Sequence, residues 1–249
     1  MKNELLELEL LLLKTGNLVL LLNFLLFIYG KFQQNGFSKP IYSIYQLTKY
    51  LFFLSIIEFI LIKFILVREF KYFEQVNVFL TSFGIKTYDF ISPPNYLLKF
   101  VFLGLFFSNV FKNKKNSNFY NYLILSLVLF ELIMVFYFRS YQSYDSISST
   151  VKNIFILTGS GLLLFKIYKA EISNISLYKN SYFWIGFALF VTAISELFLE
   201  FIFTKLHDSD LIGFYKLYLV RNAFQVAFFI MMIVAFLNTK YLRFLPEKY

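Results

Sequence analysis

Long runs of apolar residues, separated by short polar stretches, dominate the pattern along the chain. A bilayer core of roughly 30 Å needs about 20 largely apolar residues to be crossed by a helix. Seven runs approach or reach this length, so we predict an all-α, single-domain integral membrane protein built as a seven-helix bundle. The predicted spans are 8–29, 47–67, 96–111, 119–138, 151–167, 181–203 and 217–237.

The connections between the runs contain residues that commonly break helices, such as the pair Pro93-Pro94 and the stretch Asp208-Ser209-Asp210. All four prolines are predicted to lie outside the helices. The first run is preceded by Glu4, Glu7 and Glu9 and has no cleavage motif of small residues after it. We therefore expect a retained first helix rather than a signal peptide.

Composition supports the membrane interpretation and excludes several classes of function. The chain of 249 residues is 59% hydrophobic and only 16% charged, which is too apolar for an ordinary soluble domain. It contains no cysteine and a single histidine, His207. Disulfides and thiolate chemistry are excluded, and a histidine-based metal site or a Ser/His/Asp triad is not expected. The sequence thus predicts no cofactor and no metal.

The formal net charge of +9 is distributed unevenly between the two sets of connections. Twelve basic and two acidic residues lie in the connections after the first, third and fifth runs, in the C-terminal segment and at the run ends beside them. The N-terminal segment and the remaining connections, again with the run ends beside them, carry ten basic and nine acidic residues. Basic loops collect on the cytoplasmic side. The asymmetry predicts an outside N-terminus and a cytoplasmic C-terminus, in a bacterial inner membrane.

Ionisable side chains inside the predicted spans are the main candidates for function, because burying a charge in the bilayer is costly. Thr192, Glu196 and Glu200 follow at i, i+4 and i+8 and form one polar stripe, and Arg221 and Gln225 share a face of the last run. We expect a polar cluster in the outer half of the bundle, with binding candidates Glu58, Lys99, Glu131, Thr192, Glu196, Glu200, Arg221 and Gln225. It forms either a pocket for a small ligand or interhelical pairs, such as Glu200 with Arg221.

Two other segments bear on partners and packing. The cluster Lys112, Lys114 and Lys115 lies beside a span, which favours anionic lipid over nucleic acid. Residues 158–161, Thr-Gly-Ser-Gly, predict a face of small residues where helices approach closely. The aromatic connection 69–95 is compatible with an interfacial amphipathic segment or with a plain aromatic belt.

Three functions remain open at this point. The leading hypothesis is a non-enzymatic, receptor-like or accessory subunit. Its outward polar cavity would bind a small ligand or a lipid headgroup, and it would act through a partner membrane or cytoplasmic protein. The second is a transporter or channel component, and the third is a membrane-embedded enzyme using Glu196 and Glu200. No nucleophile or set of metal ligands accompanies these two carboxylates in the sequence.

The order of several motifs resembles a family of uncharacterised seven-helix membrane proteins of Bacteroidetes. The resemblance covers the chain from the third run onward and rests on Leu105-Phe106-Phe107, the stretch Phe183-Trp184-Ile185 and the run Ile233-Val234-Ala235-Phe236. It implies the same seven-helix fold and carries no activity. Arg221 and Gln225 stand where this family often has His and Asn in its last helix.

Overall fold

The computed structural model describes residues 2–66, 78–85, 88–111, 117–142, 145–169, 177–206 and 210–239, and every regular element in these ranges is helical. Seven of the helices in this part of the chain are long and apolar enough to cross a membrane. The predicted all-α fold with seven helices of membrane-spanning length is therefore confirmed. The helices are α1 (Lys2–Gln33), α2 (Lys39–Leu66), α4 (Ser92–Phe111), α5 (Ser117–Phe136), α6 (Ser146–Lys169), α7 (Ser181–Leu206) and α8 (Leu211–Leu237).

Most helices begin earlier than their apolar runs predict. The prediction that all prolines lie outside helices is wrong for Pro40, Pro93 and Pro94, which lie in the first turns of α2 and α4. The first N–H groups of a helix have no acceptor within the helix, so proline is tolerated there. Lys49, which the charge count assigned to a connection, lies well inside α2. Pro246 lies outside the described residues.

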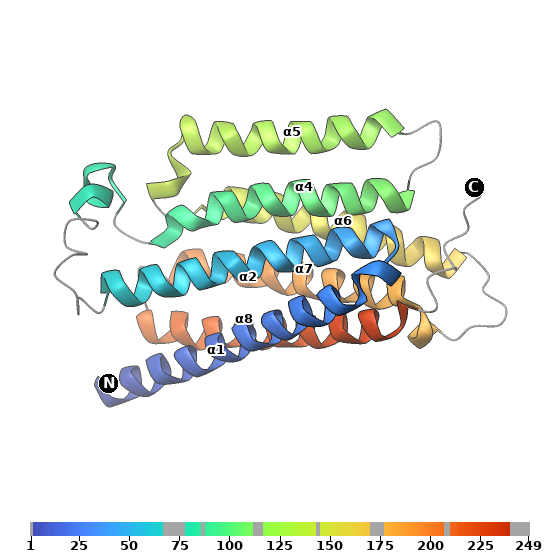
Figure 1. Ribbon diagram of the computed structural model, residues 1–249. Coiled ribbons are helices and arrows are strands. Elements are labelled where there is room, and N and C mark those ends of the chain that lie inside the picture. The colour runs from blue at the N-terminus through green and yellow to red at the C-terminus, as the bar shows by residue number, and fades with distance from the viewer. Residues whose placement is uncertain are drawn as a thin grey trace.

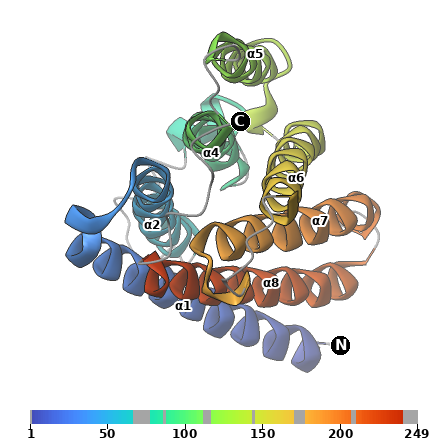
Figure 2. The same cartoon turned by 90° about the vertical axis from the view of Figure 1, so that its right-hand side faces the viewer.

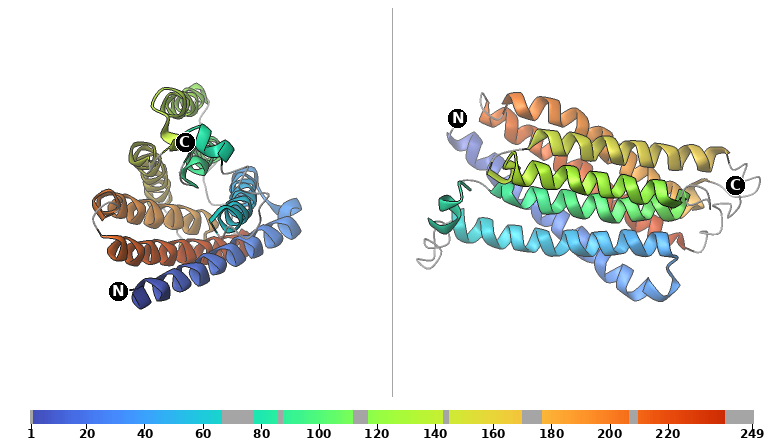
Figure 3. Two further views of the ribbon diagram at one scale, coloured as in Figure 1. Left: turned by 90° about the vertical axis from the view of Figure 1, so that its left-hand side faces the viewer. Right: turned by 90° about the horizontal axis from the view of Figure 1, so that it is seen from above.

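Successive connections lie at opposite ends of the bundle, as Figures 1 and 3 show. The start of α1 and the α5–α6 and α7–α8 connections share one end, which we call the N-terminal end. The α1–α2 connection, the α6–α7 connection and the end of α8 share the other. The described residues of that other end include Lys31, Lys39, Lys166, Lys169 and Lys179 and no acidic side chain. The charge asymmetry therefore separates the two ends of the molecule.

Six helices form a closed circuit of neighbours, and α5 lies outside it (Figure 2). Following the circuit, α1 packs against α2, α2 against α4, α4 against α6, α6 against α7, α7 against α8, and α8 against α1. The fully buried side chains Phe106, Leu163, Ile185 and Met232 belong to the core inside this circuit. Half of the apolar span of α7 is buried, against 11% of that of α5, which packs mainly against α4.

The small-residue face at residues 158–161 is a site of close helix approach, as the sequence predicts. Gly159 and Ser160 are buried, and a Cβ atom at Gly159 would overlap the ring of Phe107 on α4. Glycine at this position therefore lets the Phe107 ring of α4 pack directly against the backbone of α6.

The aromatic connection 69–95 is described only in part, since residues 67–77 and 86–87 lie outside the described ranges. Residues 78–82 form a short helical turn, and Tyr88–Ile91 form the 3-10 helix η2. The side-chain amide of Gln142 donates to the carbonyl oxygen of Phe83 at 2.9 Å, so this connection is tied to the one between α5 and α6. Phe79 and Phe83 are exposed. An interfacial role of the whole segment stays a prediction.

Candidate functional site

A buried ion pair joins α6 and α7 in the half of the bundle nearest the N-terminal end. The Nζ atom of Lys152 lies 2.7 Å from Oε2 of Glu196, and the two side chains are only 1% and 9% exposed. Two charges removed from water to this extent are normally found together, because each alone would lose its hydration without compensation. The pair is therefore the centre from which the site is built.

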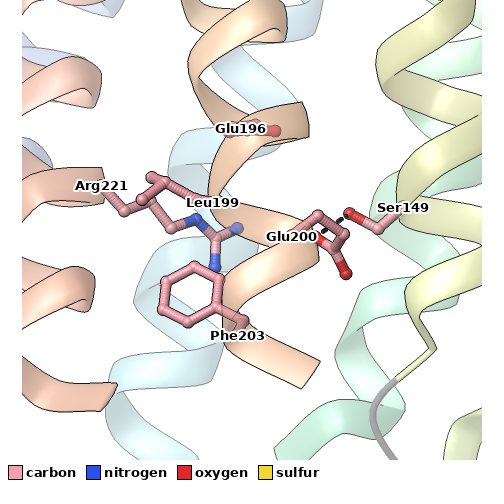
Figure 4. A pocket seen from close by; sticks show the side chains of 6 residues that line it. All are labelled: Ser149, Glu196, Leu199, Glu200, Phe203 and Arg221. Atoms are coloured by element: carbon pink, nitrogen blue, oxygen red, sulfur yellow. Dashed lines mark hydrogen bonds between the residues drawn. The ribbon is translucent and has the colours of Figure 1, made fainter. Parts of the chain in front are cut away.

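A second polar contact lies one turn along the same two helices. The hydroxyl of Ser149 donates to Oε2 of Glu200 at 2.9 Å (Figure 4), and both residues are buried. Ser149 precedes Lys152 by three residues and Glu200 follows Glu196 by four. Residues at these spacings lie on one helix face, so the antiparallel pair α6 and α7 meets through two successive polar contacts.

The third wall of the site comes from α8. Arg221 extends from α8 toward α7, and its guanidinium lies beside Phe203 in Figure 4. The same guanidinium lies 5.4 Å from the ring centre of Tyr218, at a distance typical of a cation–π contact. A narrow crevice between α6, α7 and α8 results, lined by Ser149, Glu196, Leu199, Glu200, Phe203 and Arg221.

The crevice is almost filled by these side chains. The free space in and around it is about 170 Å³, and no part of this space is wide enough to hold a water molecule. A ligand would therefore approach the charged groups through the mouth of the crevice, with side-chain movement, rather than enter a preformed chamber.

Helix α4 completes the surroundings of the ion pair. The Nζ atom of Lys152 lies 5.2 Å from the ring centre of Tyr96, and the Tyr96 hydroxyl interacts with Ser149. Lys99, one turn further along α4, lies within electrostatic range of Lys152, Glu196 and Arg221. The cluster of these residues thus sets three cationic side chains against the carboxylates of Glu196 and Glu200. With all five groups ionised it carries one positive charge in excess.

The structure brings together four of the sequence-predicted residues and places the others apart. Lys99, Glu196, Glu200 and Arg221 belong to the cluster. Thr192 lies one turn from Glu196 on α7, and its buried hydroxyl has no hydrogen-bond partner within the described residues. Gln225 lies one turn from Arg221 and is half-buried. Glu58 is half-exposed on α2, and Glu131 lies on α5. Neither of these helices contributes a side chain to the crevice.

Lys152 is the member of the site that sequence reasoning missed, because the charge count placed it with the connections. A usable signal was present: Ser149, Lys152, Ile156 and Ser160 recur every three or four residues along α6. All four are buried, so this polar and small-residue face points into the bundle.

The described residues offer little for catalysis. No group of three or more His, Asp or Glu side chains among them is placed to hold a metal ion, and His207 lies outside the described ranges. The carboxylate of Glu196 is engaged by the Lys152 ammonium at 2.7 Å. The arrangement brings the charged side chains of Lys152, Glu196, Glu200 and Arg221 together between α6, α7 and α8.

Comparison of the chain with protein-family models, with curated proteins and with solved structures gives no match. The resemblance to the Bacteroidetes seven-helix family stays a prediction, and the functional argument rests on the geometry of the site.

Proposed function

We propose that this protein is a non-enzymatic, receptor-like or accessory subunit of the bacterial inner membrane. In this proposal its N-terminal end faces outward, and the crevice between α6, α7 and α8 binds an anionic group of a small ligand or a lipid headgroup. Binding there is passed to a partner membrane or cytoplasmic protein.

The observation that carries the proposal is the convergence of three basic side chains on the carboxylates of Glu196 and Glu200 beside the crevice. Lys99, Lys152 and Arg221 surround two carboxylates, and one of those, Glu196, is already paired with Lys152. The Arg221 guanidinium lines the crevice, and its planar set of N–H donors suits phosphate or carboxylate oxygens.

The packing around the crevice favours binding over passage. Between the cluster and the other end of the bundle lie fully buried apolar side chains, among them Phe106, Leu163 and Met232. A close-packed apolar interior of this kind supports a site that opens to one side, which is typical of a receptor rather than of a channel.

The test is a thermal-unfolding measurement of the purified chain in neutral detergent, with either a short-chain phosphatidylglycerol or the matching phosphatidylcholine added. We expect a larger, saturable rise in melting temperature with the anionic lipid. Arg221→Gln should abolish the difference between the two lipids, and Arg221→Lys should retain part of it.

Lys216→Gln is the matched control, because Lys216 is a cation on the same helix but 59% exposed and paired with Glu4 outside the crevice. Each variant is compared with its own ligand-free melting temperature, so a general loss of stability does not affect the comparison. Equal responses to the two lipids in the wild type, or a full response in Arg221→Gln, would contradict the proposal.

A further inference from the structure

Glu131 on α5 is an ionisable side chain that the crevice does not use. Its side chain is completely buried, and neither carboxylate oxygen has a hydrogen-bond partner of good geometry within the described part of the chain. Burying an unpaired carboxylate costs so much free energy that such groups are found paired, protonated or bound to a metal ion. Glu131 is therefore either protonated or compensated by a group that binds beside it.

The polar groups that act on Glu131 lie at the start of α6. They are Asp145 and Ser148, which are 8% and 0% exposed. Oδ1 of Asp145 accepts hydrogen bonds from the backbone N–H groups of Ile147 and Ser148, both at 3.0 Å, and so caps α6. Its second oxygen, Oδ2, and the hydroxyl of Ser148 have no partner of good geometry in the described residues.

The four unsatisfied atoms of this group are thus all oxygens, contributed by two carboxylates and one hydroxyl. No basic side chain forms an ion pair with Glu131 among the described residues, and Arg139, the basic residue nearest to it in sequence, is exposed. Two neighbouring carboxylates repel each other. A hard cation prefers oxygen ligands of this kind, and two carboxylates match the charge of one divalent ion.

We propose that Glu131, Asp145 and Ser148 form a binding site for a divalent, oxygen-preferring cation of the Ca²⁺ class, which joins α5 to the start of α6. Water and backbone carbonyls supply the remaining ligands, as they do in many Ca²⁺ sites. Asp145 directly precedes α6 in the connection at the N-terminal end, so the ion reaches the site from the aqueous phase on that side.

The location gives the cation a structural task. Helix α5 lies outside the circuit of six helices and packs mainly against α4. An ion held between Glu131 and Asp145 adds a second attachment, to α6. The proposal shares no residue with the crevice, so its failure leaves the proposed ligand binding untouched.

The experiment uses the full chain in neutral detergent after removal of divalent ions with a chelator. Melting temperature is followed during titration with CaCl₂, and with NaCl at matched ionic strength. We expect a saturable rise with Ca²⁺, with a midpoint of about 0.1–1 mM as in extracellular modules. Glu131→Gln should lose this response, although its melting temperature without Ca²⁺ should equal or exceed that of the wild type, since one of the two neighbouring buried carboxylates is removed.

Asp210→Asn serves as the control, because Asp210 caps α8 as Asp145 caps α6 but is exposed. This variant should keep the full Ca²⁺ response. The proposal is overturned by an absent Ca²⁺ response in the wild type, which is the result expected if Glu131 simply holds a proton. It is also overturned by an equal response to NaCl, or by an unchanged response in Glu131→Gln.

Discussion

The buried pair of Lys152 and Glu196 gives the sharpest test of how this bundle is held together. Replacing Lys152 with methionine keeps most of the side-chain volume and removes the ammonium. Glu196, whose side chain is only 9% exposed, would then retain a negative charge without its ion-pair partner. We expect this single substitution to destabilise the protein more than the loss of any exposed ion pair.

The magnitude follows from the 2.7 Å separation of Nζ and Oε2. Two unit charges at this distance attract by about 6 kcal/mol at an effective dielectric constant of about 20. Burial costs each ion several kcal/mol of hydration, so the intact pair contributes little net stability relative to apolar residues. Removing one partner forfeits the attraction and keeps the other's desolvation cost, which is why breaking buried pairs costs about 3–5 kcal/mol.

A double-mutant cycle measures this directly. Lys152→Met should lower the free energy of unfolding by about 3–5 kcal/mol, and Lys152→Met combined with Glu196→Gln should recover more than half of the loss. Unfolding is followed by titration with sodium dodecyl sulfate in mixed micelles. The fluorescence of Trp184, the only tryptophan in the chain, reports on α7.

Lys216→Met is the control, since Lys216 and Glu4 form an exposed pair at 3.1 Å between α8 and α1. Exposed pairs are worth at most about 1 kcal/mol, so this variant should unfold close to the wild type. A Lys152→Met protein within about 0.5 kcal/mol of the wild type would refute the reasoning. So would a double variant that is no more stable than the single one.

Two further predictions concern orientation and packing. Because the chain has no native cysteine, Asn116→Cys and Tyr144→Cys can be labelled without background. A membrane-impermeant maleimide added to intact cells should react at position 144 and not at 116, and the reverse pattern would invert the proposed topology. Gly159→Ala should destabilise by about 1–3 kcal/mol, because its methyl group would overlap the Phe107 ring. Gly161→Ala, whose Cβ would lie 3.6 Å from its nearest neighbour outside the helix, should leave the free energy of unfolding nearly unchanged or slightly raised.

The number of helices was predictable from the sequence, but their ends were not. Apolar runs of the required length follow from the thickness of the bilayer, and that constraint is strong. Near the bilayer surface polar side chains are tolerated, so the pattern does not mark where a helix starts. Helix α2 therefore begins at Lys39, eight residues before its predicted span, with Pro40 in its first turn.

The acidic residues of the site were predictable from the sequence, but only some of its basic residues were. Glu196 and Glu200 stand out because carboxylates are rare in a span, and Arg221 because it lies near the start of one. Lys152 lies just as near to the start of a predicted span, but the charge count placed it with the connections. Which face of α6 turns toward α7 depends on the packing of the whole bundle, including the contact between Gly159 and Phe107.

The positions of Glu131 and Asp145 in the sequence likewise give no signal of the proposed cation site. These residues lie on either side of the connection between α5 and α6 and come together only in the folded chain.

The packing of α1 against α8 has a consequence for biosynthesis. The side-chain amide of Asn222 on α8 donates to the hydroxyl of Thr15 on α1 at 2.9 Å, and Lys216 pairs with Glu4 across the same contact. These residues are separated by more than 200 positions in the chain. During synthesis α1 enters the bilayer long before its neighbour exists, and the face that α8 will cover must meanwhile face lipid or an insertion factor. The circuit of six helices therefore closes only after α8 has entered the bilayer, so the contact between α1 and α8 forms long after α1 has been inserted.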